Sequence, residues 1–580
     1  MEELESEILK DLSKEEAFKH LKFFVEEVGE RLAGTPEIQK AANYIMNNLE
    51  KYGLETRIDH FPIYHSYPKS ANLQVVFPET KVIAAKPACH IASTLPEGIE
   101  GELVYLNVGA YEDYEGKDVS GKIGLVDMTW DPPRPEKARI AYEKGLKALI
   151  IMNWGATDNP IIQMGAVKGQ WGNPTPETFK EIPRLPVISI TRAAGEYLKD
   201  LCTKGEVKVW LRAEATREWV MANQPVGVLR GNKNSEEFLL VGGHLEAWGR
   251  TAICNSSGNA LTLELARVFA RHKEQLKRNL IFAFWDGHEV AEAAGSTWFV
   301  DQYWDSLTRG CIAYLNIDNP GILGTSVPGF TSVTELQEFL QNAAETFWGE
   351  KGQWHRAYKG GDESFFGIGI PYISFYTRYT EEKLKELNYA SLSPWLHSEA
   401  DTIDKIDPSL FEKHLKFFGF LGVRLCNLSI VPYDFVAVAK ELNSDLITLK
   451  NIGGKETEKE LKTLIEQVEI FQELAEKLKE KVKDKESQRP LLNKVLLKIS
   501  RELSPIMRSE AGRYGHDPYG YSLVGKPIPR LYVAINKLLD SDKESDDSKL
   551  WWTQFLRERN RVFDALNNSI EYAQFALTEC

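Results

Sequence analysis

Strands and helices alternate along the middle of the chain, and this rhythm is the clearest feature of its hydrophobic pattern. Between residues 216 and 435, compact apolar runs alternate with longer segments whose apolar residues recur every three or four positions. The segments, in order, are FLLVGGH, NALTLELARVFARHK, NLIFAFWD and GSTWFVDQYWD. Short apolar runs are typical of buried strands, and longer amphipathic segments are typical of helices. The pattern predicts an α/β fold with a mostly parallel sheet and helices on both faces.

The regions before and after this one have different patterns. Residues 1 to about 65 predict two helices and a strand, and the second helix has one apolar face. That face consists of Ile38, Ala41, Ala42, Ile45, Met46 and Leu49. From about 70 to 215 the chain is β-rich and punctuated by turn residues, and it closes with a strand, Thr191 as a helix cap, and a helix. After about 436 it is nearly all helical, with charges alternating around an apolar stripe.

We therefore expect three parts. An α/β domain is built from residues 1–68 and 216–435, a β-rich insert occupies 69–215, and a helical domain occupies 436–580. A chain of 580 residues is too long for one core, which agrees with such a division.

Imidazole and carboxylate side chains lie where the predicted strands end. His244 and Glu246 follow one apolar strand, and His288 and Glu289 follow another. Two more candidates are Asp318, which closes the run CIAYLNID, and His397, in the loop SPWLHSEADT. Because α/β sheets bind ligands at the carboxyl edge of their strands, these groups predict a hydrolytic metal site there.

Composition and charge narrow the classes of function. A net charge of −14 and the lack of a Lys/Arg block with interleaved aromatic residues argue against nucleic-acid binding. No run of about 18 apolar residues occurs, so we expect no membrane span. The six scattered cysteines and the absence of an apolar signal region indicate a reduced, cytoplasmic protein. The other histidines have no motif support and are expected mostly at the surface; they are His20, His60, His65, His90, His272, His355, His414 and His516.

These motifs, their order and the insertion together resemble family twenty-eight of the zinc peptidases. The similarity is to the branch that contains glutamate carboxypeptidase and the transferrin receptor. The segment RLAGTPEIQKAANYI resembles the first helix of that family, and SGKIGLVDM, AYEKGLKALIIMN and IPRLPVISI resemble its protease-associated insert. The resemblance implies a zinc-aminopeptidase-like fold and a helical dimerisation domain. A homodimer is therefore expected, with tail residues such as Trp551, Trp552, Phe555, Phe563 and Leu566 at helical spacing.

The resemblance also implies roles for individual residues. His244 and Asp318 would hold one metal, and Glu289 and His397 the other. Glu246 would orient a ligand histidine. We expect zinc, as one or two ions, although another divalent transition metal would suit the same ligands.

Two positions depart from the family pattern. Cys254 stands at the place of the bridging aspartate, and His288 at the place of the general-base glutamate. A thiolate can ligate zinc, and an imidazole can act as a base or as a ligand.

The substrate-binding residues expected from the resemblance lie on a loop and on one strand. They are Gly361 and Asp362 in the loop GGDESFF, and Ser374 and Tyr376 in the run ISFYT. The run ISFYT lacks the arginines with which glutamate carboxypeptidase holds acidic substrates, so that preference is not carried over.

Three functions follow from these observations. The first is a metal-dependent hydrolase of a peptide or small amide, in which His288 transfers a proton and is kept neutral by the neighbouring cation. The second is a non-catalytic homologue used for binding or dimerisation. The third is a nucleophilic amidase that uses a pair formed by Cys254 and His288.

Overall fold

The structure is a computed structural model that describes residues 2–231, 235–482, 489–519 and 525–579. The strands of the α/β domain form one mixed sheet in the order β1-β10-β12-β11-β13-β16-β14-β15. Their bounds are β1 Glu55–His65, β10 Glu218–Leu229, β11 Phe238–His244, β12 Asn279–Trp285, β13 Cys311–Asn316, β14 Val327–Ser332, β15 Gln353–Arg356 and β16 Tyr372–Arg378. The central strands β12, β11, β13 and β16 run parallel, and β1 and β10 form an antiparallel pair at one edge.

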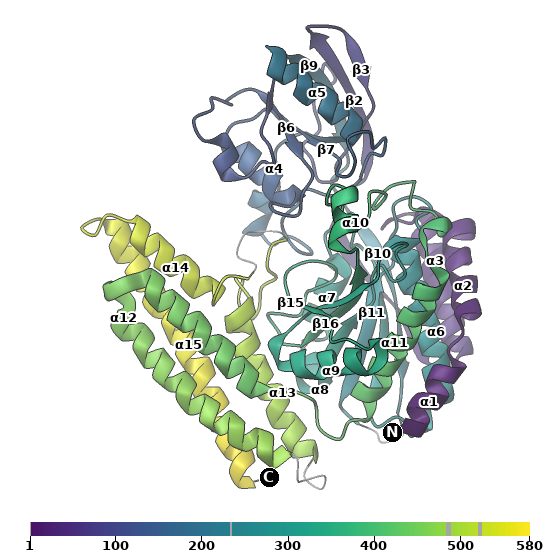
Figure 1. Cartoon of the computed structure of the whole chain (residues 1–580), viewed down its shortest axis with the longest axis vertical. Coiled ribbons are helices and arrows are strands. Elements are labelled where there is room, and N and C mark those ends of the chain that lie inside the picture. The colour runs from purple at the N-terminus through teal and green to yellow at the C-terminus, as the bar shows by residue number, and fades with distance from the viewer. Residues whose placement is uncertain (1, 232–234, 483–488, 520–524, 580) are drawn as a thin grey trace.

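Helices cover both faces of this sheet (Figure 1). They are α1 Glu2–Asp11, α2 Lys14–Lys22, η1 Phe23–Val28, α3 Pro36–Lys51, η4 Ile253–Ser257, α6 Gly258–Arg271, η5 Lys273–Gln275, α7 Ala294–Gln302, α8 Trp304–Gly310, η6 Thr334–Leu336, α9 Gln337–Trp348, α10 Glu381–Glu386, η7 Ile403–Lys405 and α11 Pro408–Asn427. Every residue of β11 is buried, as a strand between two helical layers requires.

Local sequence signals fix the helix ends. The hydroxyl of Thr35 accepts a hydrogen bond from the backbone N–H of Ile38, and Pro36 occupies the first turn of α3. The predicted apolar face of α3 is buried apart from Met46, which is half-buried. The first helix, which the sequence predicts over EEAFKHLKFFVEEVGERLA, ends early, because the helical backbone stops at Gly29, which has a φ of +79°.

The β-rich segment forms a second sheet in the order β3-β2-β9-β5-β6-β7-β8-β4, with its own hydrophobic core. Its elements are β2 Pro68–Phe77, β3 Lys81–Ile83, β4 Ala85–Pro87, β5 Ile99–Tyr105, η2 Tyr111–Tyr114, β6 Ile123–Asp127, α4 Arg134–Glu143, β7 Ala148–Met152, η3 Thr178–Glu181, β8 Val187–Ile190, α5 Arg192–Lys204 and β9 Lys208–Ala215. Thr191 caps α5 as predicted, since its hydroxyl accepts from the N–H of Ala194. We refer to this second sheet and its helices as the insert.

The C-terminal region is helical and packs beside the α/β domain (Figure 1). It contains α12 Phe435–Val482, α13 Arg489–Arg508, α14 Pro529–Asp540 and α15 Asp546–Glu579. Helix α15 contacts the other three, and Phe555 and Leu566 are buried in these contacts. The predicted fold class is thus confirmed, while the domain boundaries and the homodimer stay predictions. No helix in the described ranges is long and apolar enough to cross a membrane.

The expectation for the histidines without motif support is wrong. His20, His65, His90 and His414 are buried. The pattern of neighbouring residues did not reveal this, because the groups that bury them come from distant segments. His414 on α11, for example, contacts the rings of Phe375 and Trp348, and its Nε2 lies 3.3 Å from Thr377 Oγ1.

Burial of His414 predicts a loss of stability in acid. Burial lowers the pKa of this imidazole from 6.5 to about 3. As the pH falls below 6.5, the unfolded chain therefore binds a proton at His414 that the folded protein does not bind. The contribution of the neutral His414 ring to the free energy of unfolding is fully present above pH 6.5. It is lost as the pH falls towards 3, and about 2 kcal/mol of it is lost at pH 5. In His414→Phe, the drop in thermal midpoint between pH 7 and pH 5 should be smaller than in the parent. The control is His60→Phe at an exposed position, and equal drops in all three proteins would contradict the prediction.

Candidate metal centre

Three adjacent parallel strands deliver the candidate ligands to one edge of the sheet. His244 is the last residue of β11, which lies between β12 and β13. Glu289 follows β12 in a tight loop, and Asp318 lies two residues beyond the end of β13. Because parallel strands end at the same edge, residues far apart in sequence meet there.

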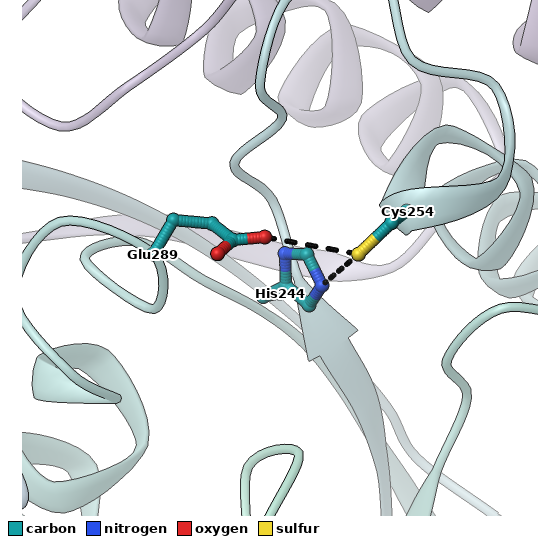
Figure 2. A group of neighbouring side chains, drawn as sticks. All are labelled: His244, Cys254 and Glu289. Carbon is teal, nitrogen blue, oxygen red and sulfur yellow. Dashed lines mark hydrogen bonds between the residues drawn. The ribbon is translucent and has the colours of Figure 1, made fainter. Parts of the chain in front are cut away.

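His244, Cys254 and Glu289 form a buried cluster (Figure 2). The Sγ atom of Cys254 lies 3.5 Å from Nε2 of His244 and 3.7 Å from Oε1 of Glu289. One donor atom of each residue lies within 4.8 Å of the other two. Zinc bonds of about 2.0–2.3 Å place neighbouring tetrahedral donors about 3.3–3.7 Å apart, so this spacing suits one ion.

Two further predicted ligands lie beside this cluster. The Oδ1 atom of Asp318 is 3.4 Å from Nε2 of His244, and Nε2 of His397 is 3.2 Å from Oε1 of Glu289. Asp318 Oδ1 is buried and has no hydrogen-bond partner among the described residues. The structure therefore brings all five predicted ligands together, and it leaves an acceptor for a cation to contact.

Backbone carbonyls orient both imidazoles. Nδ1 of His244 lies 3.1 Å from the carbonyl oxygen of Glu246, and Nδ1 of His397 lies 3.3 Å from that of Met164 in the insert. A carbonyl only accepts, so each Nδ1 carries a hydrogen, and Nε2 is the ring nitrogen that would bear the lone pair in the neutral imidazole. Neutral imidazoles with Nε2 free are the form that binds metal.

The electrostatics of the cluster favour a cation. Burial raises the pKa of the Cys254 thiol well above its usual value, and neighbouring carboxylates, Glu289 foremost, raise it further. Burial also raises the pKa of Glu289, but nearby imidazoles, His397 first, outweigh it and bring that pKa to about 2. A bound cation would offset this concentration of acids and stabilise the thiolate. The residues present thus fit a divalent metal.

Glu246 does not orient a ligand histidine through its carboxylate, contrary to our expectation. Its oxygens accept hydrogen bonds from the backbone N–H groups of Ala33 (2.5 Å) and Glu289 (2.6 Å). Burial raises its pKa to about 7. The carboxylate is turned towards backbone donors, and only the carbonyl of Glu246 faces His244. It therefore fixes the loop that carries Glu289.

His288 stacks on His244 and pairs with Asp362. The two imidazole rings are 4.1 Å apart with an interplanar angle of 12°, and His288 Nδ1 lies 3.0 Å from Oδ1 of Asp362. Burial lowers the pKa of His288, but Asp362 outweighs it and raises the pKa to about 10. The protein's own groups therefore favour the protonated ring, whereas we expected a neutral one; a neighbouring cation would act in the opposite direction.

The predicted substrate-binding residues separate into two groups. Gly361 precedes Asp362 in a loop beside His288, and a Cβ at Gly361 would lie 3.1 Å from Nδ2 of Asn316. Ser374 and Tyr376 lie on β16, and the hydroxyl of Tyr376 accepts from Thr331 at 3.4 Å on the neighbouring strand. Within the described residues, neither makes a hydrogen bond to the cluster.

Sequence reasoning missed two residues that shape the cluster. The Asp401 carboxylate accepts from the backbone N–H groups of Ile253 and Cys254 at 2.9 and 3.1 Å, which fixes the turn that carries the thiol. The Arg31 guanidinium, fully buried, donates to the Leu245 carbonyl at 2.6 Å. A signal was present, since both residues lie inside motifs that we singled out, RLAGTPEIQKAANYI and SPWLHSEADT.

The insert also reaches the site. Met164 supplies the carbonyl that orients His397, and Lys168 donates to the carbonyl of Ala291, just beyond Glu289, at 2.9 Å. Arg134 at the start of α4 is buried, and burial lowers its pKa although the charge of Glu289 opposes that shift. The candidate site thus lies between the α/β domain and the insert.

Two family models match separate parts of the chain. Residues 226–419 match the model described as Peptidase family M28, and residues 99–198 match the model of the PA domain. The two ranges lie in the α/β domain and in the insert, respectively.

Curated relatives match nearly the whole chain at low identity. The chain is 24% identical over 624 residues to "Probable glutamate carboxypeptidase VP8" of Zea mays, which covers 89% of this chain and 84% of the relative. It is 22% identical over 611 residues to "Probable glutamate carboxypeptidase LAMP1" of Arabidopsis thaliana, with 90% and 88% covered.

Solved structures share the fold. An aminopeptidase from Aneurinibacillus sp. strain AM-1 has a TM-score of 0.55 at 22% identity, and a peptidase M28 precursor from Shewanella amazonensis SB2B has a TM-score of 0.60 at 16% identity. Each similarity covers 73% of this chain and 96% of the other chain.

Proposed function

This chain carries a peptidase family M28 domain and a PA domain, and from that premise we propose that it is a metal-dependent hydrolase of peptide or small amide bonds. The observation that carries the proposal is the convergence of Cys254 with two imidazoles and two carboxylates at one sheet edge. The donor set is completed by His244, Glu289, Asp318 and His397.

Zinc is the ion that this donor set favours. Thiolate and imidazole suit borderline metals, whereas magnesium and calcium prefer oxygen ligands. We place the tightly held ion among His244, Cys254 and Glu289, whose donors are mutually closest. Asp318 and His397 would complete the ligands of that ion or would hold a second ion more weakly. When bound, zinc supplies Lewis acidity that polarises the scissile carbonyl and lowers the pKa of water.

His288 is the residue that we propose moves the proton. Its ring stacks on that of His244, so it would lie close to an ion held by His244, and 16% of its side chain is exposed. In its neutral form, which a neighbouring cation would favour, the imidazole takes a proton from the attacking water as the water oxygen bonds to the carbonyl carbon. It returns the proton to the amine nitrogen as the C–N bond breaks.

The alternative function, a nucleophilic amidase, was expected to pair Cys254 with His288, but the structure pairs these residues with other groups. The imidazole beside the thiol is that of His244, whereas His288 pairs with Asp362. The raised pKa of Cys254 also disfavours the thiolate that such an attack needs without a cation. The metal-dependent proposal accounts for the same thiol as a ligand.

A metal analysis combined with an amide-substrate panel tests the proposal. We expect the purified, zinc-supplied protein to retain zinc through gel filtration and to hydrolyse aminoacyl amides or acylated dipeptides. A chelator should abolish turnover, zinc should restore it, and iodoacetamide should leave the loaded enzyme active. Turnover that survives chelation but not iodoacetamide would establish the Cys254 nucleophile. Neither metal nor turnover would establish the non-catalytic homologue.

A further inference from the structure

We propose that Asp362 is a positioning residue for His288, held by a hydrogen-bond chain that begins at Trp171 in the insert. This chain determines which ring nitrogen of His288 exchanges a proton. The inference rests on the proposed function only where it assigns proton transfer to His288.

Four buried side chains form the chain to His288. The indole Nε1 of Trp171 donates to Oγ of Ser364 at 2.7 Å, and Ser364 Oγ lies 2.8 Å from Oγ of Ser296. Ser296 Oγ lies 3.5 Å from Oδ1 of Asp362, which lies 3.0 Å from Nδ1 of His288. Trp171, Ser364, Ser296 and Asp362 are each at most 4% exposed. The chain joins the insert, helix α7 and the loop after β15.

The indole sets the direction of the first two hydrogen bonds, from Trp171 to Ser364 and from Ser364 to Ser296. An indole N–H can only donate, so Ser364 accepts from Trp171 and must place its own hydrogen elsewhere. Among the described residues, the remaining partner of the Ser364 hydroxyl is Ser296 Oγ. Ser296 then accepts from Ser364 and directs its hydrogen to Asp362 or to the Ala293 carbonyl, 3.3 Å away. None of these hydrogen bonds requires a hydrogen from Asp362, so its carboxylate remains an acceptor.

An acceptor at Asp362 fixes the hydrogen of His288 on Nδ1. The proton that arrives and leaves must therefore be carried by Nε2. In the described part of the chain Nε2 has no hydrogen-bond partner, and it belongs to a side chain that is 16% exposed. A carboxylate that holds one nitrogen of an imidazole in this way is the arrangement that orients a histidine base.

The segment of the insert that carries Trp171, where the hydrogen-bond chain begins, is anchored on the α/β domain. Lys168 donates to the carbonyls of Gly172 and Ala291 at 2.6 and 2.9 Å, and the backbone N–H of Gly172 donates to the Glu292 carbonyl at 2.6 Å. These contacts dock the segment around Trp171 on the loop that follows Glu289. Docking of the insert is thus a condition for orienting His288.

A nuclear magnetic resonance measurement tests the orientation independently of turnover. In metal-free protein labelled with ¹⁵N at histidine Nδ1, we expect an N–H signal that is protected from exchange with water and lost in His288→Gln. In Asp362→Asn, the side-chain amide can donate to Nδ1, so this signal should disappear. Persistence of the signal in Asp362→Asn, or its absence in the parent, would overturn the proposal.

Kinetics of the zinc-loaded enzyme test what the orientation does. Asp362→Asn, which preserves the shape of the side chain, should lower kcat by roughly 10²–10⁴-fold with KM and zinc content nearly unchanged. Trp171→Phe, which removes only the donor at the far end, should lower kcat by roughly 10-fold, the equivalent of about one hydrogen bond.

A second tryptophan of the protein provides a matched control for the Trp171→Phe variant. Trp154 is also in the insert and also 4% exposed, but its indole nitrogen has no hydrogen-bond partner in the described structure. Trp154→Phe should therefore leave kcat unchanged. Equal effects of the two tryptophan variants would indicate packing alone and contradict the hydrogen-bond chain.

The two proposals fail in different ways. If no amide is hydrolysed by the parent, the proposed function fails, while the Nδ1–H signal still decides whether Asp362 holds the ring. If the signal disappears in Asp362→Asn but turnover is unchanged, the proton-transfer role of the chain is wrong although the enzyme is a hydrolase.

Discussion

Replacing His288 with alanine is expected to lower the turnover of an amide substrate by roughly 10²–10⁴-fold, the usual contribution of a positioned acid–base group. The zinc content should stay the same, because the ring of His288 stacks on His244 without donating to the cluster in Figure 2. Turnover of the zinc-loaded variant, together with mass spectrometric metal analysis of the same sample, measures both quantities.

A matched control for this variant lies elsewhere in the chain. His272 also pairs with a carboxylate, since its Nε2 lies 3.0 Å from Oδ2 of Asp11. His272→Ala removes an imidazole–carboxylate pair outside the site and should leave turnover unchanged. Loss of zinc from His288→Ala would make His288 a ligand, and unchanged turnover would remove it from the mechanism.

Replacing Cys254 with serine is expected to weaken zinc binding by more than about 100-fold, beyond the loss caused by removing an outer-shell partner. The thiol sulfur lies 3.5 Å from Nε2 of His244 and 3.7 Å from Oε1 of Glu289, and a serine hydroxyl does not ionise to replace a thiolate ligand. Competition with a chromophoric chelator gives the zinc affinity of the parent and the variant.

The partly exposed Cys202 on α5 provides the control, because Cys202→Ser changes a thiol outside the site. Its zinc affinity should equal that of the parent. An unchanged affinity in Cys254→Ser would show that the thiol is a buried bystander, and the proposed ligand set would then be wrong.

The strand ends of the site could be predicted from the sequence because the hydrophobic pattern fixes them. His244 and Glu289 follow apolar runs that become β11 and β12, and parallel strands end at one edge. Asp318 follows the same logic on β13. The fold class follows from the same alternation of strand and helix.

Contacts made by turns and loops could not be predicted in the same way. That Cys254 faces His244 depends on a turn that Asp401 holds from 147 residues away. The pairing of His288 with Asp362 depends on the path of a loop 74 residues further on. For Glu246 the motif gave the position but not the direction of the carboxylate, which backbone amides decide.

The absorption spectrum of the cobalt-substituted protein tests the central claim most directly. If Cys254, His244 and Glu289 hold a metal ion, the parent protein loaded with Co²⁺ in place of zinc should show a sulfur-to-cobalt charge-transfer band, together with the intense visible bands of a low-coordinate site. Both should vanish when zinc is added in excess. A protein that binds no cobalt, or that binds it without a sulfur-to-cobalt band, would contradict the account.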